Sequence, residues 1–263
     1  MSPPFGEKLR SKQPVLGMIV YSCSPIVVEN IAHGGVDFVF IDMEHTPIGW
    51  ETLEHMVRAA QVAQAGTLVR VTENNPFHIR KALETGADCV IVPHIASRKD
   101  AEQAVRSAKF PPKGIRGATS YARAAKYSAN WSTYLNDTNE NVLVMAMIEE
   151  PEAVENIEEI ASTDGLAGLN FGPLDYAVST GIVNSPERQS KTREVQRVIA
   201  SAAKKYDLVL AAVLPPNMDG FDELLGLGYT VFLMGYDLAV LRKFASDGAT
   251  KFQELLRNSR APR

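Results

Sequence analysis

The chain has 263 residues and a formal net charge of -4 at pH 7, with 45% hydrophobic and 22% charged residues. This balance is typical of a globular protein with a large core, and it offers no basic field for nucleic acid or an anionic membrane. We therefore expect small-molecule partners and neither nucleic acid nor membrane. Cys23 and Cys89 lack metal-ligand spacing, and the first residues lack the apolar segment of a signal peptide, which favours a reduced, cytoplasmic protein.

Apolar, β-branched runs recur along the chain and predict eight strands. They are Val15–Val20, Phe38–Ile41, Thr67–Val71, Cys89–Val92, Val142–Ile148, Ala167–Phe171, Leu208–Val213 and Thr230–Met234. Segments with helical periodicity lie between most of them, at Trp50–Ala63, Asp100–Ala108, Glu152–Ile160, Glu187–Lys205, Phe221–Leu225 and Ala239–Leu256. Alternating strands and helices indicate a parallel sheet, and eight units of ~30 residues predict a single (β/α)8 TIM-barrel domain over residues 1–263. The alternative is an open doubly wound sheet, which usually carries a GxGxxG turn that this chain lacks.

Two predicted connections are unusually long, at Phe110–Asn141 and Gly172–Glu187. Connections of this length in a compact domain tend to be functional or disordered. The first contains aromatic residues and arginines, including Arg123, which argues against plain disorder.

Polar side chains follow most of the predicted strands. The carboxyl ends of barrel strands meet at one mouth, where catalytic residues gather. We therefore expect one ring at that mouth, formed by Asp42, Glu44, His45, Arg70, His94, Glu149, Glu150 and Asp175.

Glu149 and Asp175 lie about one strand–helix unit apart, so their carboxylates can converge at neighbouring strand ends. Two carboxylates with open positions suit a hard divalent ion such as Mg²⁺ or Mn²⁺. The alternative is that Glu149 caps the following helix, since Glu-Glu-Pro-Glu is a favourable first turn. Glu150 fits that capping role better than Glu149 does.

Arg70 ends an otherwise apolar strand, where a guanidinium can bind a planar carboxylate or a phosphate. The alternative for Arg70 is an ion pair with Glu73 or Glu84. His45 can act as a general base near neutral pH, and its alternative is a hydrogen bond within its own loop.

Several motifs, in order along the chain, carry a resemblance to a known family. They are Asp37-Phe-Val-Phe-Ile-Asp42-Met-Glu44-His45, Val69-Arg70-Val71, the segment from Gly86 to Pro93, Pro111-Pro-Lys-Gly-Ile-Arg116-Gly117, Ile148-Glu149, and Asn170-Phe-Gly172-Pro173-Leu-Asp175-Tyr. Together they resemble the HpcH/HpaI aldolases. These are metal-dependent class II pyruvate aldolases that include 2,4-dihydroxyhept-2-enedioate aldolase and 2-keto-3-deoxy-sugar-acid aldolases.

The resemblance implies a barrel of the phosphoenolpyruvate/pyruvate type that often swaps its last helix between subunits of a homo-oligomer, a hexamer or a trimer. It implies an enzyme that reversibly cleaves a 4-hydroxy-2-oxo acid into pyruvate and an aldehyde through a pyruvate enolate. The alternative is a related lyase, either an oxaloacetate decarboxylase or a CoA-ester lyase of the citrate-lyase β type.

The resemblance also implies residue roles. Glu149 and Asp175 would bind Mg²⁺, Mn²⁺ or Co²⁺, Arg70 would lie beside the keto oxygen, and His45 would transfer a proton with support from Asp42. The turn at Gly172, Pro173 and Leu174 would supply donors to the pyruvate carboxylate.

Three positions depart from the family pattern, and the least important is Met43, which stands where small residues are common. Glu84 stands where an aspartate commonly pairs with the histidine, and we expect it to orient His45. Met147 replaces a common glutamine, so one polar contact to pyruvate is missing. Arg123 suggests an acidic or polyhydroxylated substrate tail, and its equal alternative is to order its own loop. We expect Glu44 to be the least certain participant.

Overall fold

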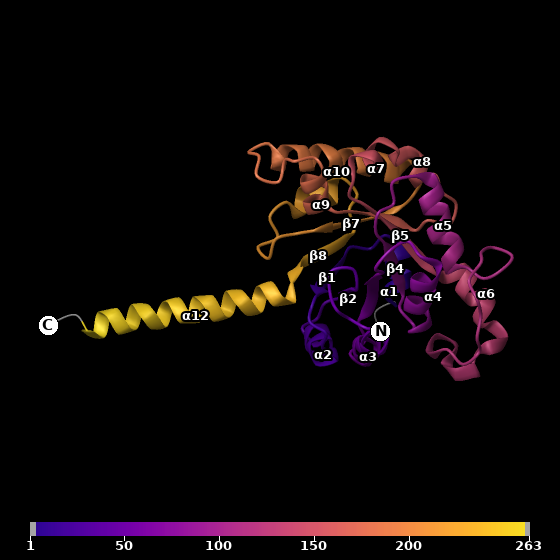
Figure 1. Ribbon diagram of the computed structural model, residues 1–263, viewed down its shortest axis with the longest axis horizontal. Coiled ribbons are helices and arrows are strands. Elements are labelled where there is room, and N and C mark those ends of the chain that lie inside the picture. The colour runs from indigo at the N-terminus through magenta and orange to yellow at the C-terminus, as the bar shows by residue number, and fades with distance from the viewer. Residues whose placement is uncertain (1–3, 261–263) are drawn as a thin grey trace.

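The computed structural model describes residues 4–260, and its strands close into a parallel barrel (Figure 1). Within this range the strands are β1 Val15–Val20, β2 Phe38–Asp42, β3 Gly66–Arg70, β4 Cys89–Val92, β5 Leu143–Ile148, β6 Gly168–Phe171, β7 Val209–Val213 and β8 Val231–Tyr236. Each pairs with its neighbour in chain order, and β8 pairs with β1. The predicted (β/α)8 barrel is therefore confirmed.

The continuous apolar runs reflect burial on both faces of the sheet. In β2, Phe38 and Phe40 belong to the cluster inside the barrel, whereas Val39 and Ile41 belong to the cluster between strands and helices. Successive side chains of a strand point to opposite faces, so both parities must be apolar when both faces are buried.

The first helix closes the amino-terminal end of the barrel. Helix α1 (Phe5–Arg10) places the Phe5 ring on Phe38, with ring centroids 4.9 Å apart. A Cβ on Gly66 would lie 2.2 Å from the Phe5 ring, so β3 needs glycine at that position. With this end filled, the carboxyl ends of the strands form the open mouth.

The remaining helices follow along the chain, and most of them lie around the strands (Figure 1). They are α2 Pro25–His33, α3 Trp50–Val62, α4 Pro76–Glu84, α5 Arg98–Ala108, α6 Trp131–Asn141, α7 Pro151–Glu155, α8 Ile157–Ala161, α9 Pro173–Ser179, α10 Arg188–Lys205, α11 Phe221–Gly226 and α12 Asp237–Arg260, with a 3-10 segment, η1, at Arg123–Ser128. The helix predicted at Glu152–Ile160 is broken at Asn156, whose side chain donates a hydrogen bond to the carbonyl of Ala96. The long connection after β4 contains η1 and α6 and so is ordered.

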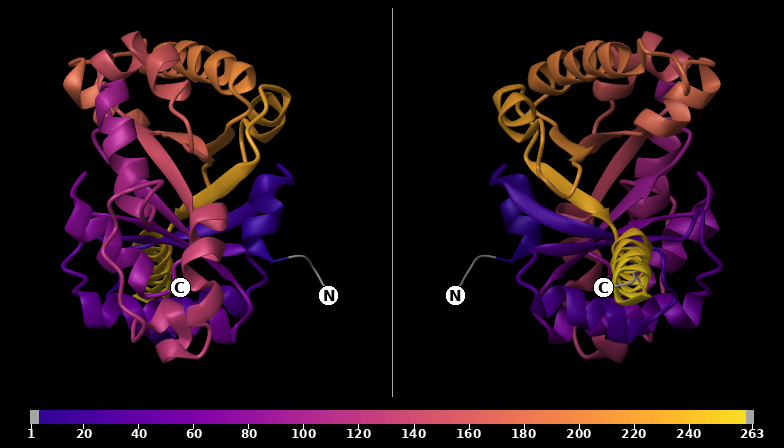
Figure 2. Two further views of the ribbon diagram at one scale, coloured as in Figure 1. Left: turned by 90° about the vertical axis from the view of Figure 1, so that its right-hand side faces the viewer. Right: turned by 90° about the vertical axis from the view of Figure 1, so that its left-hand side faces the viewer.

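Helix α12 projects away from the barrel (Figures 1 and 2). Its exposed residues include large apolar side chains at Leu238, Val240, Leu241, Phe244, Phe252 and Leu255. Exposed apolar surface on this scale usually marks an interaction site. None of the helices between residues 4 and 260 is long and apolar enough to cross a membrane.

Candidate active site

A cavity of about 840 Å³ opens at the carboxyl ends of the strands. Its wall includes Tyr21, His45, Arg70, Asn170, Asp175 and Tyr236. The turn at Gly172, Pro173 and Leu174 also lines it, as do residues of the first turns of α12. Of the expected ring of polar residues, His45, Arg70 and Asp175 line this cavity, and Arg70 contacts two further members, Asp42 and Glu44.

A buried ion pair anchors the site. Asp42 and Arg70 are register partners at the ends of β2 and β3. Asp42 is fully buried and accepts hydrogen bonds from Arg70 Nε at 3.0 Å and from Arg70 Nη2. Burial alone would lower the pKa of Arg70, but the hydrogen bonds and charge of Asp42 raise it overall. The guanidinium is therefore charged and fixed in orientation.

The turn after β2 is built on the same carboxylate. Asp42 Oδ1 accepts from the backbone N–H of Glu44 at 2.9 Å and from that of His45 at 3.3 Å. Thr46 Oγ1 donates to the carbonyl oxygen of Asp42. The placement of Asp42 thus matches the supporting position expected from the sequence, beneath both Arg70 and the turn that carries His45.

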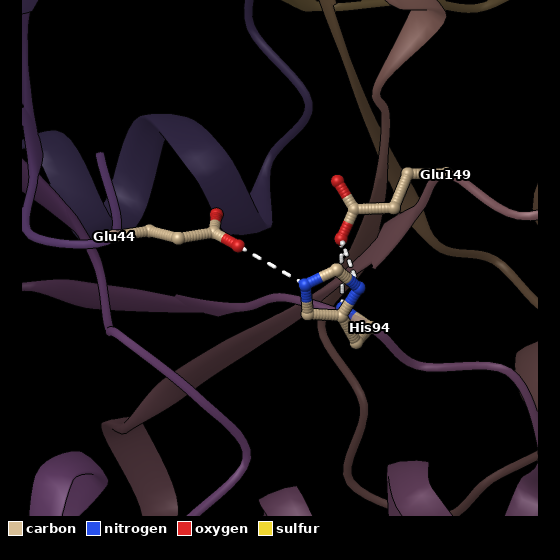
Figure 3. A group of neighbouring side chains, drawn as sticks. All are labelled: Glu44, His94 and Glu149. Carbon is tan, nitrogen blue, oxygen red and sulfur yellow. Dashed lines mark hydrogen bonds and ion pairs between the residues drawn. The ribbon is translucent and has the colours of Figure 1, made fainter. Parts of the chain in front are cut away.

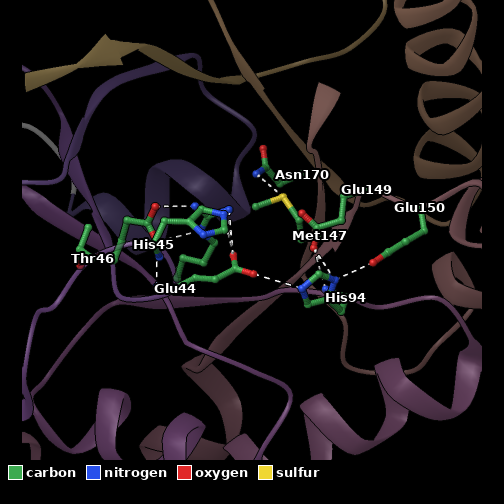
Figure 4. Close-up of polar contacts among 10 residues, drawn as sticks. Glu44, His45, Thr46, His94, Met147, Glu149, Glu150 and Asn170 are labelled. Carbon is green, nitrogen blue, oxygen red and sulfur yellow. Dashed lines mark hydrogen bonds and ion pairs between the residues drawn. The ribbon is translucent and has the colours of Figure 1, made fainter. Parts of the chain in front are cut away.

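Glu44 lies at the centre of the polar network, contrary to its expected minor place (Figure 4). Its Oε2 lies 3.0 Å from Arg70 Nη1 and 3.8 Å from His45 Nε2, and its Oε1 lies 3.2 Å from His94 Nε2. Glu44 is largely buried, whereas the His45 side chain is 48% exposed and faces the cavity. Sequence reasoning ranked Glu44 low because the position of a turn residue depends on how the turn folds.

His94 links three carboxylates, of which Figure 3 shows those of Glu44 and Glu149 and Figure 4 also that of Glu150. Besides its contact with Glu44, its Nδ1 lies 3.4 Å from Glu149 Oε1 and 2.5 Å from Glu150 Oε1. Its backbone N–H donates to Glu149 Oε1 at 2.8 Å, from a left-handed conformation with φ of 55°. Burial lowers the pKa of His94, but the hydrogen bond to Glu150 and the charges of Glu149 and Glu44 raise it overall.

Glu149 is a buried carboxylate that suits a cation. Its side chain is 1% exposed, and burial raises its pKa to about 7, against the opposing effect of the His94 N–H. A Cβ on Gly172 would lie 3.1 Å from Glu149 Oε2, so glycine leaves room for this carboxylate. Asp175 lies in the first turn of α9, which begins directly after Gly172.

These donors fit a divalent ion. Carboxylate oxygens are the ligands that Mg²⁺ and Mn²⁺ prefer. The set that the structure assembles is Glu44, His94 and Glu149, whose ligand atoms lie within 4.8 Å of one another. The pair of Glu149 and Asp175 is the set expected from the sequence. Glu149 belongs to both sets and is therefore central to either arrangement.

The structure corrects the expected role of Glu84. This residue ends α4, where it lies 3.9 Å from Arg80 Nε and 3.7 Å from Lys81 Nζ, in a groove between α3 and α4. A helix that follows a barrel strand runs back from the mouth, so its last residue lies toward the other end of the barrel. Within the chain, Glu44 and not Glu84 is the carboxylate beside His45.

For Arg123 the structure favours the second alternative, that this residue orders its own loop, over a contact with the substrate. It begins η1 and donates hydrogen bonds to the carbonyl of Thr85 and to Gln61 Oε1. Thr85 is the C-cap of α4, where a cation satisfies the last carbonyl groups. Arg123 thus orders its own loop and does not line the cavity of its own chain.

A parallel barrel with carboxylates, an arginine and a histidine at its open end is the arrangement of TIM-barrel enzymes. The family model for HpcH/HpaI aldolase/citrate lyase matches residues 16–243, and the chain belongs to this family. Membership confirms the family expected from the sequence and, with it, a carbon–carbon lyase.

Named relatives cover nearly all of the chain. It is 30% identical to 2-dehydro-3,6-dideoxy-6-sulfogluconate aldolase of Pseudomonas putida, over 91% of this chain and 92% of that protein. It is also 30% identical to 5-keto-4-deoxy-D-glucarate aldolase of Klebsiella pneumoniae, over 95% of this chain and 96% of that protein. A crystal structure of a family protein from Burkholderia cenocepacia superposes with a TM-score of 0.87 at 27% identity, covering 94% of this chain and 98% of that one.

Glu149→Gln should stabilise the metal-free protein at high pH. The folded-state pKa of Glu149 is about 7 and the reference value is 4.5, so the folded protein keeps a proton that the unfolded chain has released between these values. The free energy of unfolding therefore falls as pH rises through this window. At pH 8 with chelator, the free energy of unfolding measured in urea should be about 1–3 kcal/mol higher for the variant than for the wild type. The difference should shrink at pH 4.5.

Glu155→Gln, at an exposed position of α7, is the matched control, and it should leave the free energy of unfolding nearly unchanged. If the Glu149→Gln protein is less stable than the wild type at pH 8, the buried charge of Glu149 does not destabilise the folded protein.

Proposed function

We propose that the protein is a metal-dependent aldolase that reversibly cleaves 4-hydroxy-2-oxo acids into pyruvate and an aldehyde. One observation carries the proposal: the Arg70 guanidinium, held by Asp42 and Glu44, faces the same cavity as His45 and the α9 turn. The two relatives described above are both named as aldolases, which supports the same activity.

Glu149 and Asp175 would hold the divalent ion, Mg²⁺, Mn²⁺ or Co²⁺. The supporting observation is the raised pKa of Glu149, because a carboxylate destabilised by burial gains from a nearby cation. The oxygen donors also match these ions. When bound, the ion supplies a Lewis acid that polarises the 2-oxo group of the substrate.

The α9 turn would bind the carboxylate of the 2-oxo acid. Gly172 is the N-cap and Pro173 is the first helical residue. The next two backbone N–H groups, of Leu174 and Asp175, precede the first intrahelical bond, which Tyr176 donates to Gly172. Free N–H groups at a helix start suit an anion.

His45 would remove the proton from the C4 hydroxyl group. The C3–C4 bond then breaks, the aldehyde leaves, and the electron pair of that bond forms the enolate of pyruvate. Negative charge develops on the former oxo oxygen, where the fixed guanidinium of Arg70 stabilises it without reorganising. Protonation at C3 completes pyruvate. Glu44, 3.8 Å from His45 Nε2, orients the imidazole within the chain.

Helix α12 would complete its contacts in a homo-oligomer, a hexamer or a trimer. Nearly all of its residues from Leu238 onward are exposed, including Phe244 and Phe252. A projecting helix with apolar side chains suits exchange with a neighbouring copy of the chain.

Purified protein should release pyruvate from 4-hydroxy-2-oxo acids, and a chelator should abolish the release. Added Mn²⁺ or Mg²⁺ should restore it. Glu149→Ala and Asp175→Ala should lower kcat/KM at least ~10³-fold and weaken Mn²⁺ binding in calorimetry, because each removes a ligand. Circular dichroism should show an unchanged fold, and Glu155→Ala is the control. Full activity in chelator, or in either variant, would exclude the proposed site. Decarboxylation of oxaloacetate without aldol cleavage would favour the decarboxylase alternative.

His45→Ala should slow the exchange of pyruvate methyl protons with deuterated water by ~10²-fold or more while metal binding stays intact. Nuclear magnetic resonance measures the exchange directly. Exchange at the wild-type rate would assign the base to another residue.

The protein should elute at a multiple of its 28.8 kDa chain mass in light scattering. Phe252→Asp should shift the population toward the monomer, because it places a charge on the apolar surface of α12. Gln253→Asp, at the adjacent exposed position, is the matched control. A wild-type protein that is monomeric at micromolar concentration would rule out the exchanged helix.

A further inference from the structure

Asn170 is a buried polar residue in the wall of the cavity. It lies on β6 directly opposite Met147 of β5 in the sheet register, and both residues line the cavity. Asn170 is 3% exposed. Among the described residues, Nδ2 donates to Met147 Sδ at 3.1 Å, and Oδ1 is buried without a hydrogen-bond partner (Figure 4).

This arrangement leaves the amide poorly satisfied. A thioether sulfur is a weak acceptor, whereas an asparagine amide offers two donors and a carbonyl acceptor. Turning the amide over exchanges its oxygen and nitrogen, but either orientation leaves one end without a strong partner. Buried polar groups are nearly always paired, and a partnerless one in a cavity wall points to a ligand.

The neighbouring contacts show which part of a ligand would meet the amide. Met147 Sδ lies 3.6 Å from the position of a Cβ on Gly172, at the start of the α9 turn. Asn170 precedes Gly172 by two residues. The amide therefore stands below the turn that would receive the carboxylate, and the cavity wall that carries it also carries Arg70.

We propose that Asn170 binds the pyruvate portion of the substrate by donating a hydrogen bond from Nδ2 to its oxygen atoms. This inference rests on the function proposed above, since it names a further residue of the same site. Met147 cannot make this contact, because a thioether has no donor. The amide donor is therefore supplied by Asn170 of β6, and its register partner on β5 is Met147.

The test measures pyruvate binding by calorimetry with Mn²⁺ at saturation, together with Mn²⁺ binding and steady-state kinetics. Asn170→Leu should lower the affinity for pyruvate at least ~10-fold. It should raise KM more than it lowers kcat, because the contact is present in the ground state. Mn²⁺ affinity should stay within ~2-fold of wild type. Asn170→Asp replaces the donor with a charge of the same sign as that of the substrate, so it should lower the affinity for pyruvate further. Asn184→Leu, in an exposed loop, is the matched control.

A rescue variant separates substrate binding from a structural role. Met147→Gln in the Asn170→Leu background returns an amide to the same space from the opposite strand, and it should recover most of the pyruvate affinity. Asn170→Ala replaces the leucine variant if the latter does not fold. Wild-type pyruvate affinity in a folded Asn170 variant, or no recovery by Met147→Gln, would overturn the assignment. A wild-type protein that binds neither Mn²⁺ nor pyruvate would instead reject the proposed function.

Discussion

The buried pair of Asp42 and Arg70 is the constraint on which the site depends. Each ends a strand, and the β2–β3 register places them opposite each other, so closure of the barrel brings them together. Losing Arg70 would leave the buried charge of Asp42 without its ion-pair partner, which typically costs about 3–5 kcal/mol. Because Asp42 also holds the backbone of Glu44 and His45, one carboxylate fixes both the guanidinium and the turn that carries the histidine.

Negative charge is concentrated around this pair. Glu44, Glu149 and Glu150 converge on His94, and burial leaves Glu149 with a pKa near 7. Burial of the Glu149 charge, with a smaller contribution from the charge of Glu44, destabilises the metal-free protein, and a nearby cation offsets that cost. The stability of the protein and its proposed dependence on metal therefore have one electrostatic origin.

The barrel was predictable because burial on both faces produces long apolar runs, and every predicted strand is present. Helices α2 and α4 were missed, although each has a capping side chain, Ser24 or Asn75, followed by proline at the first helical position. Strand-end residues such as Arg70 and Asp175 were placed correctly because all parallel strands end at one mouth. Glu84 was misplaced because its position depends on the direction of a helix. The two alternatives for Arg123 stayed open because its position depends on the path of a loop.

The amino-acid sequence by itself determined the barrel, the family and the ring of polar residues at the open end, because strand periodicity and strand ends are local properties. The tertiary structure decided which of those residues touch. It placed Glu44 between Arg70, His45 and His94, and it set Asn170 against Met147 with an unpaired carbonyl oxygen. Apart from the contact between the adjacent residues Glu44 and His45, those contacts join residues that follow or belong to different strands, and their distances follow from the register and closure of the sheet.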